Sequence, residues 1–125
     1  MKIDEHTPPR VLTVGNSVRF DMRDCGRVAL QPDEQVTFTT EGGGELDVAR
    51  KDWGFYATPS LNGRLEDFGL RAVLVCNILT GRYYVLVVER GKEAAFDAYL
   101  VQESCEVVHW LDTTEALETL RAKIG

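Results

Sequence analysis

The stretch LRAVLVCNILTGRYYVLVVE, residues 70–89, decides the fold. It contains two near-continuous apolar runs, 70–79 and 82–89, which flank the dipeptide Thr80-Gly81. Apolar runs of this length, rich in valine, leucine and tyrosine, indicate two strands joined by a tight turn. Because neither run alternates with polar residues, we expect both strands to be central and buried on both faces. The sequence therefore predicts a sheet organised around this hairpin.

Shorter candidate strands precede the hairpin. Residues 17–22 alternate apolar with charged side chains, residues 36–40 are β-branched and aromatic, and residues 45–51 alternate again. The glycines between the last two segments, in EGGGE, supply the positive φ that a hairpin loop needs. Residues 27–30 form a further candidate strand, and residues 1–10 are expected to be an irregular N-terminal arm because they contain adjacent prolines.

Helical spacing appears only after residue 91. Phe96, Tyr99 and Leu100 fall at i, i+3 and i+4, which predicts a helix with one apolar stripe. Residues 106–111, EVVHWL, indicate another strand, and Asp112 with Glu115 three residues later predicts the start of a second helix. The buried stripe of that last helix is expected to comprise Leu117, Leu120 and Ile124.

These patterns predict an α+β fold. We expect a mainly antiparallel β-sheet or open barrel of about six to seven strands, with one or two helices near the C-terminus. The 125 residues correspond to a single domain, 1–125, that is large enough to form its own core.

Composition limits the classes of function. The net charge is −6 and no basic cluster is present, which argues against binding nucleic acid or an anionic membrane. No apolar run approaches the roughly 20 residues that span a bilayer, and we expect no secretory leader because the first ten residues lack an apolar segment. Cys25, Cys76 and Cys105 form no CxxC pair, so we expect three free thiols and a cytoplasmic location.

Signatures of catalysis and metal binding are missing from the sequence. Cys105 and His109 lie close in sequence, but four residues of strand rise roughly 13 Å, too far for a nucleophile and its base. The two histidines, His6 and His109, lie at opposite ends of the chain and match no ligand spacing for zinc. We therefore expect no metal site and no cofactor, and the sequence leaves open whether the protein is an enzyme.

The segment DWGFYATPSLNGRL, residues 52–65, is the main candidate for a functional site. Its proline and glycines are typical of a turn, and its aromatic side chains could simply cover an edge of the core. It also carries polar side chains at every second position, which would share one face if the segment were extended. The candidate ligand-binding residues are Trp53, Tyr56, Ser60, Asn62 and Arg64.

Three functions fit this segment. The first is a small cytosolic binding domain that recognises a polar, anionic small molecule, such as a sugar phosphate or nucleotide sugar, with Arg64 gripping the anion. The alternative is a protein–protein interaction domain or accessory subunit, including a homodimer, that uses the same aromatic loop. The third is an enzyme in which Arg64 orients a substrate and Glu66 or Asp67 acts as acid or base. A pocket onto which Arg64 and Asn62 converge would favour the first function, and an exposed aromatic patch would favour the second.

Overall fold

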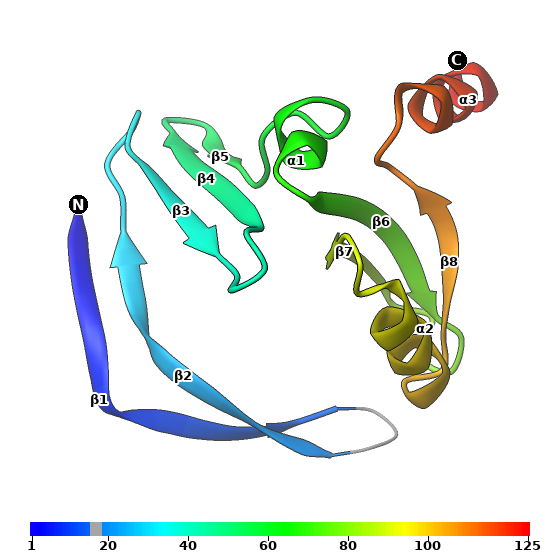
Figure 1. The fold of residues 1–125 in the computed structure, drawn as a ribbon. Coiled ribbons are helices and arrows are strands. Elements are labelled where there is room, and N and C mark those ends of the chain that lie inside the picture. The colour runs from blue at the N-terminus through cyan, green and yellow to red at the C-terminus, as the bar shows by residue number, and fades with distance from the viewer. Residues whose placement is uncertain (16–18) are drawn as a thin grey trace.

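The computed structural model describes residues 1–15 and 19–125. Within these ranges the chain forms eight strands in three antiparallel sheets, together with three helices (Figure 1). The described strands do not close into a barrel. The predicted α+β class is therefore confirmed, with one strand more than expected. No helix of the described residues is long and apolar enough to cross a membrane.

The predicted central hairpin forms the third sheet. Strand β6 (Leu70–Asn77) pairs along its length with β7 (Tyr83–Glu89), and β8 (Cys105–Trp110) pairs with its other side. β6 is buried or half-buried throughout, as expected for a central strand. The expectation that β7 is central is wrong: β7 lies at an edge of the sheet, and its first three residues, Tyr83, Tyr84 and Val85, are exposed.

Both faces of β6 contribute to the core. On one face, Val73 and Val75 pack with Val88, and helix α2 (Glu93–Gln102) covers them with the predicted residues Phe96 and Leu100. The second cluster comprises Leu65, Leu70 and Ala72, and Leu65 comes from the short helix α1 (Arg64–Asp67). The segment that follows residues 52–63 is thus anchored against the most buried strand of the protein.

The second sheet contains β3 (Gln35–Thr39), β4 (Glu45–Lys51) and β5 (Gly54–Tyr56) in that order. The predicted β3–β4 hairpin is confirmed, and Gly43 in its loop has a φ of +93°, which favours glycine. Strand β5 was not expected, because three residues are too few to show an alternating pattern.

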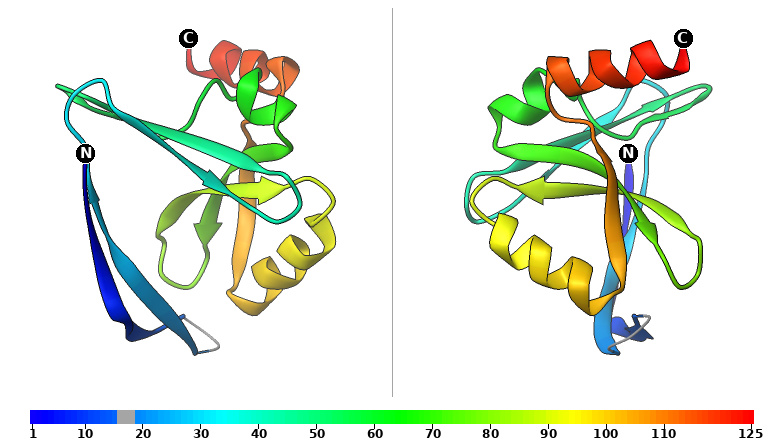
Figure 2. Two further views of the ribbon diagram at one scale, coloured as in Figure 1. Left: turned by 60° about the vertical axis from the view of Figure 1, so that its left-hand side comes forward. Right: turned by 90° about the vertical axis from the view of Figure 1, so that its right-hand side faces the viewer.

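The N-terminal residues form a β-hairpin arm. The expectation of an irregular segment 1–10 is wrong: β1 (Lys2–Val14) pairs with β2 (Phe20–Ala29) from Lys2 opposite Ala29 to Val14 opposite Phe20. The prolines are accommodated because they lie where the register shifts, between Glu5 and Arg10. The single strand β2 contains residues 20–22 and 27–29 of the candidate strands 17–22 and 27–30, residues 19 and 30 lie just beyond its ends, and residues 17 and 18 lie outside the described residues. Most of the arm stands away from the other two sheets (Figures 1 and 2), and its tip approaches the third sheet.

The C-terminal helix α3 (Thr114–Ile124) begins one residue later than predicted. Its N-cap is Thr113 and not Asp112. The Thr113 hydroxyl accepts a hydrogen bond from the Ala116 backbone N–H. Asp112 instead accepts a 2.7 Å hydrogen bond from Nε of Arg71. The expected buried stripe is also wrong, because Leu117 and Leu120 are only half-buried and Ile124 is 78% exposed.

Candidate functional site

Residues 52–65 form an edge strand, a turn and the start of a helix. After β4, Gly54 with a φ of +147° lets the chain reverse so that β5 pairs with β4. The strand ends after Tyr56, and backbone hydrogen bonds from Gly63 and Leu65 to the Ser60 carbonyl form the turn that leads into α1. The segment is therefore not extended over its length, contrary to the condition under which its polar residues would all share one face.

The three aromatic side chains of this segment are exposed. Trp53 is 66% exposed, Phe55 56% and Tyr56 55%. Trp53 and Tyr56 form an edge-to-face pair with ring centroids 5.6 Å apart, and the Arg50 guanidinium lies over the Phe55 ring at 5.9 Å. Covering an edge of the core is the simplest structural role that the sequence allows these side chains, and they do not have it.

Arg64 is held by internal partners. Its Nε donates to Oδ2 of Asp47, and its Nη2 lies 3.8 Å from Oε1 of Glu45. Its guanidinium also lies 4.2 Å from the centroid of the Phe68 ring. The carboxylates that bind it are not those of Glu66 and Asp67, its nearest acidic neighbours in sequence. Both carboxylates come from β4, where alternation places them on one face.

Asp47 is the buried end of this ion pair. Only 7% of its side chain is exposed, and Thr37 donates to its other oxygen at 2.6 Å. The hydrogen bonds from Arg64 and then Thr37 hold the pKa of Asp47 below its ordinary value. The Asp47 carboxylate in turn raises the pKa of Arg64. The pair is ionised at neutral pH, and the positive charge of Arg64 is matched by Asp47.

A groove of about 300 Å³ brings together Tyr56, Ser60 and Arg64, three of the five predicted ligand-binding residues. The Ser60 hydroxyl there accepts from the Arg64 backbone N–H at 2.9 Å. Trp53 and Asn62 do not line the groove; Asn62 donates to the Thr114 hydroxyl at 3.0 Å and so ties the turn to α3. The full set of lining residues is Gln35, Asp47, Ala49, Tyr56, Thr58, Pro59, Ser60 and Arg64.

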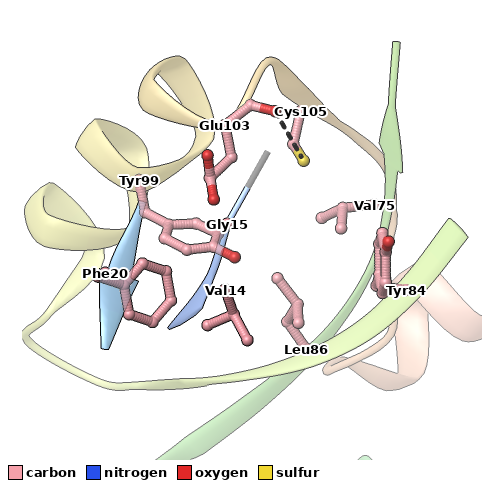
Figure 3. A pocket seen from close by; sticks show the side chains of 9 residues that line it. All are labelled: Val14, Gly15, Phe20, Val75, Tyr84, Leu86, Tyr99, Glu103 and Cys105. Atoms are coloured by element: carbon pink, nitrogen blue, oxygen red, sulfur yellow. Dashed lines mark hydrogen bonds between the residues drawn. The ribbon is translucent and has the colours of Figure 1, made fainter. Parts of the chain in front are cut away.

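A second hollow, of about 240 Å³, lies between the tip of the β1–β2 arm and the third sheet (Figure 3). Val14, Phe20 and Leu86 give it apolar walls, whereas Glu103 and Tyr99 place a carboxylate and a hydroxyl in it. Burial, and then the Glu103 charge, raise the pKa of Tyr99, and the same two causes raise the pKa of Cys105. Both groups therefore stay protonated at neutral pH.

Sequence reasoning missed this second hollow. Part of the signal is present, because Glu103 lies four residues after Tyr99 and so continues the apolar stripe of α2 with a carboxylate. The other wall comes from the arm, and nothing local in the sequence predicts that it approaches α2. Cys105 and His109 do not form a catalytic pair: Nε2 of His109 lies 2.8 Å from the Ala116 carbonyl oxygen, and Cys105 lines the hollow.

Among residues 1–15 and 19–125, no group of three or more histidine, cysteine, aspartate or glutamate side chains could hold a metal ion. All three cysteines are free. Comparison of the chain with protein-family models, with curated proteins and with solved structures finds no match.

Proposed function

We propose that this chain is a protein-interaction domain that binds a partner through an aromatic surface that wraps around the edge strand β5, with Trp53 and Tyr56 on one face and Phe55 on the other. The observation that carries the proposal is that all three large side chains are more than half exposed on one short hairpin. Tryptophan and tyrosine dominate the binding energy of protein interfaces because each buries a large, rigid, amphipathic surface. Arg50, which lies over Phe55, adds a third residue type favoured at such anchors.

The contacts within the aromatic surface also favour binding. The Trp53–Tyr56 pair and the Arg50–Phe55 contact restrict these side chains before any partner arrives. Restricting rotamers in advance lowers the entropy cost of association, which is roughly 0.5–1.5 kcal/mol for each immobilised side chain. The aromatic surface is also held in place by the short connection to β4 and by α1, whose Leu65 is buried in the core.

The anionic small molecule is less well supported by this geometry. An anion needs a cation that is not already neutralised, and Arg64 is paired with Asp47 and lies near Glu45. The groove nevertheless favours a second candidate function, the binding of a neutral polar molecule such as a sugar. Its ring could stack on Tyr56, and its hydroxyls could bond to Gln35, Thr58 and Ser60.

The test compares proteins captured by the wild-type chain and by a Trp53→Ala/Phe55→Ala variant from extracts of the source cells. Val101→Ala is the matched control, since Val101 is 83% exposed but lies on α2, away from this surface. We expect a partner that is retained by the wild type and the control and lost by the double variant. An identical set of captured proteins in all three samples would contradict the proposal. For the second candidate, a neutral sugar at about 100 times its Kd should stabilise the wild type by about 2.7 kcal/mol.

A further inference from the structure

The free edge of β7 carries backbone groups that no other strand uses. In an antiparallel pair, alternate residues of a strand exchange hydrogen bonds with its neighbour. Asn77 N donates to the Arg82 carbonyl at 2.8 Å and Arg90 N donates to the Gly69 carbonyl at 2.7 Å, so even-numbered residues of this strand bond toward β6. The N–H and C=O groups of Tyr83, Val85 and Val87 therefore point away from β6. No backbone hydrogen bond among the described residues engages them.

This edge also lacks the features that protect other outer strands from pairing. β1 contains Pro8 and Pro9, its partner β2 shares the register shift, and β8 has a register shift of its own. β3 and β5 are only five and three residues long. By contrast, residues 83–88 contain no proline, glycine or charge, and Tyr83 and Val85 are 64% and 59% exposed. A long, apolar, uncharged edge is a template for another strand.

We propose that β7 pairs in antiparallel fashion with β7 of a second copy of this chain, so that two three-stranded sheets join into one continuous sheet. Antiparallel pairing of identical strands is compatible with the two-fold symmetry of most homodimers. Two residues can exchange hydrogen bonds across this edge only if the backbone N–H and C=O groups of both point away from β6. Val85 therefore lies opposite Val85 of the partner subunit, and Tyr83 lies opposite Val87 of the partner subunit. Each outward-facing group then has a partner.

The charges at the ends of the strand do not oppose this arrangement. Arg82 precedes one end of β7 and Glu89 occupies the other, with only uncharged residues between them. Antiparallel pairing about Val85 places Arg82 opposite Val88 of the partner subunit and Glu89 opposite Gly81 of the partner subunit, so no charged residue lies directly opposite another one. The exposed Val85 side chain lies at the centre of the joint, and the exposed Tyr83 side chain gains a cross-strand apolar contact with Val87 of the partner subunit.

The experiment measures mass by sedimentation equilibrium over a wide range of concentration. Two variants change the edge without changing the pairing with β6: Val85→Lys adds a charge to an exposed side chain, and Val85→Pro removes an outward N–H. Leu79→Lys is the matched control, because Leu79 is 71% exposed but lies outside the strand. We expect the wild type and the control to reach twice the 14.0 kDa mass of the chain, and both Val85 variants to remain monomeric.

A wild type that stays monomeric at every concentration would overturn the proposal, as would a dimer that persists in both Val85 variants. If those variants do not fold, Val85→Cys decides: residues that exchange hydrogen bonds across the two-fold axis have Cα atoms about 5.5 Å apart, within disulfide reach. Oxidation should then give a covalent dimer from Val85→Cys and none from Leu79→Cys, and the reverse would refute the pairing. The Trp53→Ala/Phe55→Ala variant should keep the dimer mass, so this proposal and the proposed function fail separately.

Discussion

Arg64→Ala distinguishes a structural arginine from a ligand-binding one. If Arg64 were free to bind an anion, its removal would leave stability within about 0.5 kcal/mol, the usual range for surface changes. The structure predicts a larger cost, because Asp47 is buried and would lose the partner that offsets its burial. A hydrogen bond to a charged group contributes about 1.5–3 kcal/mol, but Arg64 is 46% exposed and solvent screens part of that. We therefore expect a loss of about 1–2 kcal/mol.

The assay is urea unfolding of the wild type, Arg64→Ala, Asp47→Asn and the double variant. A double-mutant cycle isolates the interaction between the two side chains, and we expect a coupling of about 1 kcal/mol. Arg82→Ala serves as the control, because Arg82 is exposed and no hydrogen bond from its guanidinium to a described residue is present. A cost for Arg64→Ala below about 0.5 kcal/mol, equal to that of Arg82→Ala, would refute the reasoning.

The same pair gives a dependence of stability on pH. The pKa of Asp47 is lowered in the folded state, from an ordinary value of 3.8. A lowered pKa stabilises the folded protein fully above the unfolded value, and this stabilisation is lost as the pH falls through the folded pKa. The wild type should therefore lose stability below about pH 4 more steeply than Arg64→Ala. Parallel pH profiles for the two proteins would contradict the assigned pairing.

Two further predictions concern the core and the thiols. Arg71→Ala should cost about 3 kcal/mol in urea unfolding, because it leaves the buried Asp112 without its 2.7 Å hydrogen bond. It also removes the guanidinium that lies 3.9 Å from the Trp110 ring centroid. An effect as small as that of Arg82→Ala would contradict this prediction. In a thiol-reactive dye assay of the native protein, the exposed Cys25 should react first, and Cys105 should react slowly because burial raises its pKa. All three cysteines should react after denaturation. A fast reaction of Cys105 in the native protein would contradict its assignment to the hollow.

Local patterns in the sequence predict the elements of this fold well. The apolar runs predict β6 and β7, the glycines of EGGGE predict the β3–β4 hairpin, and helical spacing predicts α2 and α3. Each of these signals lies within about ten residues, where strand alternation, turn chemistry and helical periodicity act directly. The N-terminal arm was missed because adjacent prolines argue against a strand, yet an edge strand with a register shift accommodates them.

The partners of the site residues could be predicted only in part. Alternation along β4 places Glu45 and Asp47 on one face, and this much is readable from the sequence. That Arg64 lies over this face depends on the turn after β5, whose geometry sets where α1 begins. Proximity in sequence alone favours Glu66 and Asp67 as partners of Arg64 instead. An ion pair between residues 17 positions apart is a product of topology, and topology has no short-range signal.

The wrong prediction that β7 is a central strand has a different physical cause. Its sequence predicts burial on both faces, and the chain supplies neighbours for only part of that surface. Apolar composition reports how much surface a strand is suited to bury, whereas a single chain shows only the part that it buries itself. An edge strand can be apolar at low cost if its free edge is covered in the assembled state, but it is a liability if it stays open. Trp53 and Phe55 show the same mismatch between apolar composition and exposure, and they belong to the aromatic surface proposed to bind a partner. At both places, the apolar surface that the chain leaves open marks where another molecule is expected to bind.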